Sequence, residues 1–232
     1  ITRKARVCIN SAGMKEWHLG GGINHLEVQP LFPLSAENEM GEKLDSVMQK
    51  IKKDSVYKRM FKQAFGSGEI SSERMLKALA QFTGSLVSAD SKYDRVKRGE
   101  AKFILPEKKG YEIFKANCNA CHKEPLFTDN SYRNNGITLN RFNDIGRQGI
   151  SLQRTDSLKF KVPTLRNAAL TLPYMHDGRF HFLDKVLDHY SDLDTSLPNL
   201  DPLLKKKIVI TEKEKQQLLL FLYTLTDTSF TK

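Results

Sequence analysis

Two cysteines and a histidine in one short stretch constrain this chain more than any other feature. Cys118 and Cys121 are separated by two residues, and His122 comes directly after them. On a helical turn, two thiols at this spacing can reach the two vinyl groups along one edge of a porphyrin, and the adjacent imidazole then faces the iron. C-x-x-C-H is the attachment pattern of c-type haem. The motif therefore predicts one covalently bound haem c.

Three alternatives to haem compete for this motif. A zinc site needs further ligands, usually a second Cys or His pair at short spacing, and no such pair occurs downstream. A thioredoxin-like redox pair needs a strand–helix context, which the sequence lacks here, and the third alternative is chance. Haem is favoured over all three. Three cysteines in 232 residues do not form a disulfide framework, so Cys8 is interpreted as an ordinary thiol.

The charge of the chain bears on its partners. The net charge is +10, from 37 Lys and Arg against 27 Asp and Glu. The basic residues are spread along the sequence, and the runs at 52–53 and 205–207 are too short to indicate more than solvated faces. We therefore predict no nucleic-acid partner. A weakly basic docking face for an acidic redox partner explains the charge better.

The sequence predicts neither a membrane span nor a signal peptide. It has no run of 18 or more apolar residues, and it lacks the apolar core of a signal peptide. We expect that an export signal has been removed, or that the chain is a piece of something longer. Because haem is attached to C-x-x-C-H outside the cytoplasmic membrane, we expect a periplasmic location.

Apolar residues recur at spacings of three and four, which predicts a mostly helical chain. Between His122 and Asp184 the sequence is rich in Gly, Asn, Asp and Pro, and a long irregular segment of this kind usually wraps a cofactor. Two helices are expected over 38–53 and 55–65. A third is capped by Ser71 or Ser72 and has an apolar side that includes Phe82 and Val87. A fourth has Pro106 as its first residue and runs toward Cys118, and a C-terminal helix begins at a Thr211–Glu214 capping box.

A haem iron bound by His122 has a sixth coordination position, for which the sequence offers several possible ligands. The downstream candidates are Met175, His176, His181, His189 and Tyr190. Each also has a structural interpretation, such as core filling by methionine or loop hydrogen bonding by histidine. Spacing alone does not choose among them.

Several short blocks occur in a specific order along the chain. They are Leu26-Glu27-x-Gln29, Glu39-Met40, Ala64-Phe65-Gly66, Leu79-Ala80-x-Phe82 with Leu86-Val87-Ser88, Tyr93-Asp94, the haem motif, Asp144-Ile145-Gly146-Arg147, Phe160 to Asn167, Pro173 to Phe180, and Leu222-x-x-Leu225-Thr226. From about residue 26 to 226 the chain resembles the bacterial di-haem cytochrome c peroxidase and MauG family.

The resemblance implies a fold and a division of the chain. The family has two cytochrome c-like helical domains with one haem each. Hydrogen peroxide reacts at the first haem, and the second haem transfers electrons. The single C-x-x-C-H here stands where the second belongs, with His122 as proximal ligand. We therefore expect an all-α fold, in which residues 1–88 are the helical remnant of the peroxidatic domain. Residues 89–232 would form the cytochrome c-like electron-transfer domain with long haem-wrapping loops.

The resemblance also assigns further site residues. Gln29 and Glu39 match residues of the family's peroxide pocket, where a carboxylate can act in general acid–base catalysis. The alternative is that both lie on a helix surface. Arg166 is expected to contact the cofactor. Thr171 and Pro173 match residues whose carbonyls help to bind calcium, although the family's third contact, an Asn before its Trp-Asp-Gly-Arg motif, has no counterpart that we can place.

The distal ligand implied by the resemblance is Tyr190. In the family this ligand lies fourteen residues after the His of His-Asp-Gly, which is His176 here, and it is Met in peroxidases and Tyr in MauG-like members. Met175 is the weaker alternative, beside an open site or a histidine. A thioether raises the reduction potential, whereas a phenolate stabilises ferric and higher-valent iron.

The start of the chain departs from the family pattern. A Trp-Asp-Gly-Arg motif should stand ten residues before Gln29, but residues 19–22 read Leu-Gly-Gly-Gly and Trp17 lies two residues early. We expect residues 1 to about 20 to be a truncated or frame-shifted start.

The expected function is that of a haem peroxidase. Electrons would come to hydrogen peroxide from a small cytochrome c or a cupredoxin, or from a protein substrate in the MauG manner, and a homodimer is compatible with the resemblance. The full-length protein would hold two haems c and this chain one, so the isolated chain should have little peroxidase activity. The alternative from another class is a mono-haem electron-transfer protein, and an apo helical domain is expected if haem-ligation machinery is absent.

Overall fold

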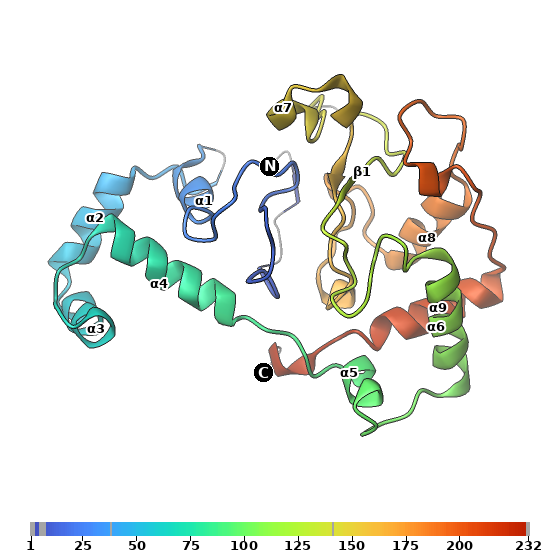
Figure 1. Cartoon of the computed structure of the whole chain (residues 1–232), viewed down its shortest axis with the longest axis horizontal. Helices are drawn as coiled ribbons and strands as arrows, with labels where there is room; N and C mark the ends of the chain where they lie inside the picture. The colour runs from blue at the N-terminus through green and yellow to red at the C-terminus, as the bar shows by residue number, and fades with distance from the viewer. Residues whose placement is uncertain (1–2, 5–7, 38, 141, 231–232) are drawn as a thin grey trace. The chain divides into compact units, whose positions relative to one another are not determined.

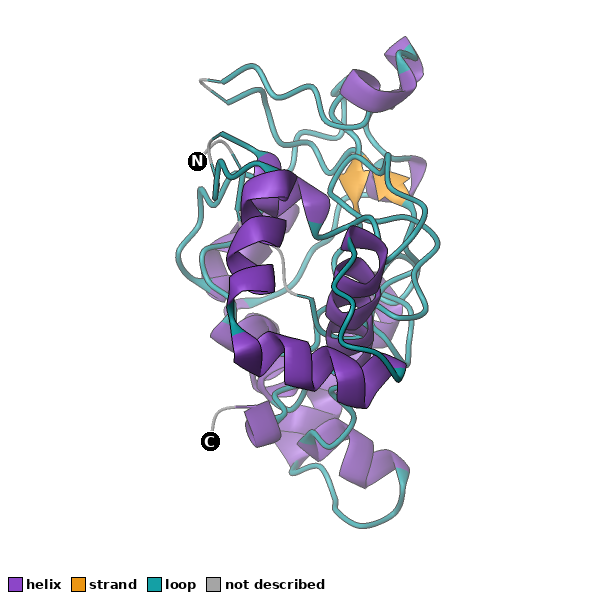
Figure 2. Cartoon of the chain, turned by 90° about the vertical axis from the view of Figure 1, so that its left-hand side faces the viewer, coloured by secondary structure: helices purple, strands orange, loops and turns teal. Residues whose placement is uncertain are grey.

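The computed structural model describes residues 3–4, 8–37, 39–140 and 142–230. These residues form two compact units, and the chain passes for the last time from the first to the second between Val87 and Ser88. Helices and long loops make up most of the described chain, as predicted, and strand is confined to two short segments (Figure 2). Among the described residues, no helix is both long and apolar enough to cross a membrane.

The first unit comprises Cys8–Trp17 and Gly22–Val87. Its helices are α1 (Leu31–Ser35), α2 (Leu44–Lys53), α3 (Ser55–Phe65) and α4 (Ser72–Ser85), which are labelled in Figure 1. The small core of this unit is built from Met48, Phe61, Ile70 and Met75. Partly buried apolar side chains from α1 to α4 pack against this core.

Local sequence signals set the helix ends in this unit. Asp54 accepts a hydrogen bond from the Val56 amide and begins α3, and Gly66 ends it in the left-handed region at φ 78°. Ser71 caps α4 by accepting from the Arg74 amide at 3.3 Å. The helix predicted over 38–53 begins only at Leu44, because the chain makes a turn before it. The first residue of that prediction, Asn38, lies outside the described residues.

The predicted apolar side of α4 is only partly buried. Met75 is in the core, and Leu76 and Leu79 pack against it. Phe82 is 63% exposed, and Val87 after the helix is exposed as well. The apolar side of α4 is therefore exposed toward the C-terminal end of the helix.

The second unit contains most of the chain, from Ser88 onward. Its elements are α5 (Lys92–Lys97), α6 (Leu105–Asn117), β1 (Tyr132–Arg133), α7 (Gln148–Ser151), β2 (Phe160–Lys161), α8 (Leu183–Ser191), α9 (Glu212–Tyr223) and the 3-10 turns Arg154–Asp156, Ala168–Leu170, Pro202–Leu204 and Thr228–Phe230. The segment predicted to be irregular between His122 and Asp184 is mostly loop. Within it β1 and β2 pair antiparallel, Tyr132 opposite Lys161.

Helices α6 and α9 pack directly on each other. A Cβ added at Gly110 would lie 1.9 Å from the Gln217 carbonyl oxygen, so only glycine permits this approach. Beside it, Phe114 and Phe221 are fully buried with ring centroids 5.1 Å apart. Helix α9 begins at the predicted capping box, in which the Glu214 carboxylate accepts from the Thr211 amide at 2.7 Å. Helix α6 begins at Leu105, one residue before Pro106.

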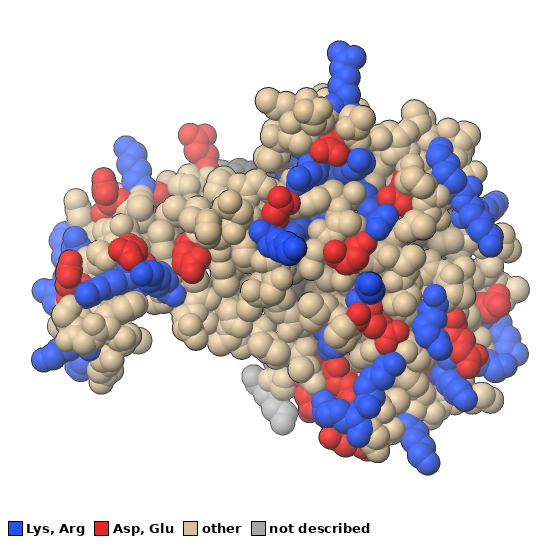
Figure 3. All heavy atoms as spheres, in the orientation of Figure 1, with Lys and Arg blue, Asp and Glu red and all other residues tan. Residues whose placement is uncertain are grey.

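Two observations qualify the expected layout. Residues 3–4 and His18–Gly21 group with the second unit, although they precede the predicted boundary at residue 88. On the face shown in Figure 3, Lys and Arg are interspersed with Asp and Glu, as the sequence suggested, and they do not gather in one basic patch.

Candidate haem site

The two thiols of the motif lie on one turn at the end of α6. Cys118 is the first residue after the helix, and its carbonyl accepts hydrogen bonds from the amides of Cys121 at 3.2 Å and His122 at 2.9 Å. Both cysteines are half-buried and free, and the exposed Cys8 is free as well. Burial raises the pKa of Cys118 to about 12 and also raises that of Cys121.

These features disfavour a zinc site. A zinc ion in a protein needs three or four protein ligands. Among the described residues, no group of three or more His, Cys, Asp or Glu side chains could hold a metal ion. Two free thiols on one turn instead suit thioether attachment to a porphyrin edge.

The imidazole of His122 is oriented by two backbone carbonyls. Its Nδ1 lies 3.2 Å from the Phe127 oxygen and 3.1 Å from the Pro163 oxygen. Carbonyl oxygens only accept, so Nδ1 carries the proton and donates. Burial lowers the pKa of His122, and the neutral ring therefore presents an unprotonated Nε2. This is the arrangement of a metal-binding histidine whose other nitrogen fixes its tautomer.

Two loop segments supply those carbonyls and are joined to each other. We name residues 125–128 and 162–166 the proximal loop pair. The bonds between them are Thr164 Oγ1 to Leu126 O at 2.6 Å, the Leu165 amide to Phe127 O at 3.3 Å, Thr128 Oγ1 to Val162 O at 2.6 Å, and Arg166 Nε to Pro125 O at 3.0 Å. The carbonyls around His122 are thus held by a ladder of hydrogen bonds.

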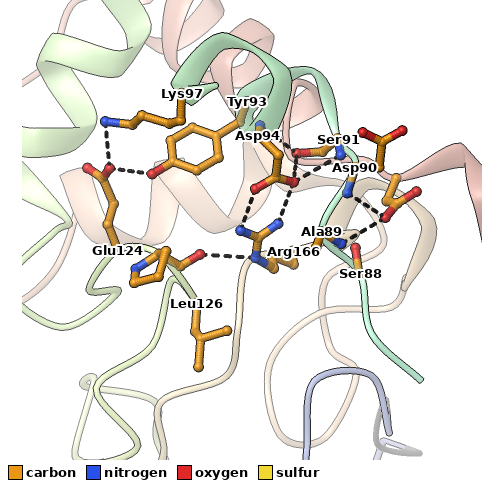
Figure 4. Close-up of polar contacts among 12 residues, drawn as sticks. Ser88, Ala89, Asp90, Ser91, Tyr93, Asp94, Lys97, Glu124, Leu126 and Arg166 are labelled. Carbon is orange, nitrogen blue, oxygen red and sulfur yellow. Dashed lines mark hydrogen bonds and ion pairs between the residues drawn. The ribbon is translucent and has the colours of Figure 1, made fainter. Parts of the chain in front are cut away.

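Arg166 anchors this loop pair to α5. Its two terminal nitrogens donate to the two Asp94 carboxylate oxygens, each at 2.8 Å. Asp94 also accepts from the Ser91 amide and hydroxyl in the capping box of α5. Figure 4 shows the guanidinium between Asp94 and the backbone next to Leu126. Because its described side-chain hydrogen bonds all go to protein oxygens, the expected contact of Arg166 with the cofactor stays a prediction.

A second polar cluster lies beside this pair. The Glu124 carboxylate accepts a hydrogen bond from the Tyr93 hydroxyl and pairs with Lys97 at 3.2 Å (Figure 4). It also accepts from the Tyr111 hydroxyl at 3.0 Å. Burial in the first place, and then the adjacent Glu124, raise the pKa of Tyr93 far above its ordinary value. Glu124 therefore joins the segment after the haem motif to both α5 and α6.

Two of the sixth-ligand candidates converge on one amide. Asn135 Nδ2 lies 3.5 Å from Met175 Sδ and 3.5 Å from Tyr190 Oη. Burial raises the pKa of the Tyr190 hydroxyl, and the thiols of Cys118 and Cys121 raise it further. Tyr190 and Met175 are therefore both close to the same side-chain amide.

The three histidine candidates are placed differently. His189 Nε2 is 2.9 Å from the Asn135 carbonyl oxygen, so it has a hydrogen-bonding role. His176 is buried and stacked on Phe160 at 3.8 Å, and its Nε2 has no hydrogen-bond partner among the described residues. His181 is exposed.

The other predicted residues are distributed over both units. Gln29 and Glu39 belong to the first unit, on either side of α1; Gln29 is half-buried and Glu39 exposed. Thr171 and Pro173 lie in the second unit. The Thr171 carbonyl, an expected calcium contact, accepts a hydrogen bond from the Lys4 ammonium.

Comparisons with known proteins bear on this arrangement. A sequence model described as di-haem cytochrome c peroxidase matches residues 1–102. The MauG methylamine utilization protein of Methylophilus methylotrophus is 31% identical over 96% of this chain and 68% of its own length. This chain belongs to the di-haem cytochrome c peroxidase and MauG family. The MauG protein of Methylorubrum extorquens is 34% identical over 97% of this chain, which spans 65% of that relative's length.

A solved structure extends the likeness to the whole chain. A crystal structure of a MauG-like protein associated with microbial copper homeostasis superposes with a TM-score of 0.89. It is 30% identical, and the match covers 100% of this chain and 77% of that one. The family's match also includes residues before Gly20, where the sequence shows no recognisable family block.

Some groups of the site could not be found from the sequence. No sequence motif marks Phe127 and Pro163, which contribute backbone carbonyls, or Asn135, which contributes its side-chain amide. Asp94 and Arg166 each lie in a recognised block, but neither block indicates that the two are partners. Only the folded chain brings these groups together.

Proposed function

We propose that this chain carries the electron-transfer haem of a di-haem peroxidase. The orientation of His122 carries the proposal, because its Nδ1 is committed to two carbonyls while the free thiols lie on the same turn. Cys118 and Cys121 would form the thioethers, and His122 would be the proximal ligand. When bound, the haem supplies one-electron redox chemistry at a potential set largely by its axial ligands.

The distal ligand in this proposal is Tyr190. Its side chain is half-buried, and its hydroxyl shares Asn135 with the Met175 sulfur. Met175 is the second choice, since its sulfur is equally close to Asn135. His189 is less suited because the Asn135 carbonyl engages its Nε2.

The whole enzyme would reduce hydrogen peroxide, or use it for oxidation. Membership of the family supports this activity. Gln29 and Glu39 would serve the peroxide pocket, and the reducing partner would be a small cytochrome c, a cupredoxin or a protein substrate, in the periplasm. Calcium at the Thr171 and Pro173 carbonyls would have to displace the Lys4 ammonium.

The peroxidase proposal is tested with haem-loaded chain and with the longer gene product. Single-turnover mixing with hydrogen peroxide, and then steady-state turnover with a reduced cytochrome, should show little activity in the 232-residue chain. The longer product should turn over and contain two haems by pyridine haemochrome. Robust turnover by the 232-residue chain would contradict the division of roles between the haems. A longer product with one haem and no turnover would favour the mono-haem electron carrier, to which the single C-x-x-C-H points equally.

A further inference from the structure

Arg166 occupies a position between α5 and the proximal loop pair. Its side chain is 4% exposed, and that of Asp94 is 11% exposed. Each of the three guanidinium nitrogens donates to a protein oxygen: two to Asp94 and one to the Pro125 carbonyl. A direct contact with the cofactor is not needed to explain this residue.

The Pro125 carbonyl lies close in the chain to a carbonyl that contacts His122. Pro125 begins the first segment of the proximal loop pair, and two residues later the Phe127 carbonyl receives the His122 Nδ1 proton. On the other segment, Pro163 supplies the second carbonyl only three residues before Arg166. Arg166 therefore belongs to one loop and binds the other, just beyond the two carbonyls that face His122.

We propose that Arg166, fixed by Asp94, is a positioning residue for His122. By clamping the proximal loop pair, it sets how strongly the Phe127 and Pro163 carbonyls accept the Nδ1 proton. A stronger bond at Nδ1 makes the imidazole a better electron donor through Nε2. The proposal rests on the proposed function, in which His122 binds the haem iron.

The geometry required is that of arginine and not merely a positive charge. A guanidinium offers a planar fork to both oxygens of a carboxylate and a third donor to the side. A lysine ammonium at the same place cannot span Asp94 and the Pro125 carbonyl together. The conservative variant Arg166→Lys therefore separates geometry from charge.

The experiment measures the reduction potential of holoprotein by equilibrium titration. The variants are Arg166→Lys, Asp94→Asn and the milder Thr164→Val. The last removes a half-buried hydroxyl that donates to the Leu126 carbonyl and accepts from the Arg166 amide. The matched control is Glu107→Gln. It breaks another partly buried ion pair of α5, the one with Lys92 at 2.7 Å, and it does not touch the loop pair.

We expect Arg166→Lys to change the reduced-to-oxidised ratio at fixed potential by about tenfold, which is 59 mV for one electron. The potential should rise, because a weaker Nδ1 bond leaves ferric iron less stabilised. Thr164→Val should shift it in the same direction by less, and Glu107→Gln should leave it unchanged. Exchange of the His122 Nδ1 proton, measured by NMR, should be faster in the first three variants only.

Two failures can be told apart. If His122→Ala leaves the axial-ligand spectrum unchanged, His122 is not the ligand, and the proposed function fails with the inference. If His122 is the ligand but the reduction potentials of Arg166→Lys and Thr164→Val equal that of the control Glu107→Gln, Arg166 does not position His122. The proposed function then stands. A third outcome is that Arg166→Lys keeps the wild-type reduction potential while Asp94→Asn changes it. The positive charge at residue 166, and not the geometry of arginine, would then set the potential, and the inference would also be overturned.

Discussion

The hydroxyl of Tyr190 lies 3.5 Å from the side-chain nitrogen of Asn135, which is equally far from the Met175 sulfur. Tyr190 and Met175 lie 15 positions apart in the sequence, and a single amide brings both to the expected distal side of the haem. Two of the five sixth-ligand candidates therefore share one side-chain amide, and a pair of substitutions can tell their roles apart.

Tyr190→Phe should change the haem spectrum, whereas Met175→Leu should not. Phenylalanine keeps the ring but removes the oxygen, so phenolate ligation and its stabilisation of ferric iron are lost, and the reduction potential rises. Absorption and electron paramagnetic resonance spectra of the ferric holoproteins provide the measurement. An altered spectrum in Met175→Leu with an unchanged one in Tyr190→Phe would assign the ligand to methionine.

Gly110→Ala should destabilise the second unit strongly. The added Cβ would fall 1.9 Å from the Gln217 carbonyl oxygen and 2.9 Å from Phe221 Cβ, so α6 and α9 would have to separate. Overpacking of a close helix contact costs about 1–3 kcal/mol or more. Chemical denaturation measures the change, and Gly149→Ala, where the nearest atom is 3.9 Å away, serves as the control with little effect. Equal stability of the two variants would contradict the close packing of these helices.

Asp227 should stabilise the fold at neutral pH and lose its effect in acid. Burial alone would raise its pKa, but hydrogen bonds from Ser229, the Asp90 amide and Ser88 lower it to about 2. A lowered folded-state pKa contributes stability that is complete above the unfolded value of 3.8 and is lost as the pH falls toward 2. Asp227→Asn should therefore lower the free energy of unfolding at pH 7 by about 2 kcal/mol.

Urea denaturation of wild type and Asp227→Asn at several pH values tests this. The difference between the two proteins should shrink as the pH falls below about 4. A difference that stays constant down to pH 2 would mean that the carboxylate charge is not what the surrounding donors stabilise.

The sequence predicts the local features of this fold well. Thr211 is identified as a helix cap, and Ser71 as one of two candidates with Ser72, because a cap depends on residues only three positions apart. Ser71 and Thr211 are the caps that form. The start of α2 is misplaced, since Lys43 precedes it without a side-chain cap. No signal before that helix marks where the turn ends.

Contacts between distant residues could not be predicted from the sequence. Asp94 and Arg166 are 72 positions apart, and the Pro163 carbonyl is 41 positions from His122. Every residue has a backbone carbonyl, so residue type does not show which carbonyl contacts His122. An ion pair between distant residues leaves no repeating pattern in the sequence. The haem motif could therefore be found in the sequence, but the groups that orient its histidine could not.

The mass of the intact protein, made with haem-ligation machinery, tests the central claim most directly. Wild-type chain should gain the mass of one haem, Cys118→Ser/Cys121→Ser should gain none, and Cys8→Ser should match wild type. A wild-type chain that remains at its polypeptide mass under conditions where a control cytochrome c is fully loaded would contradict haem attachment at this site.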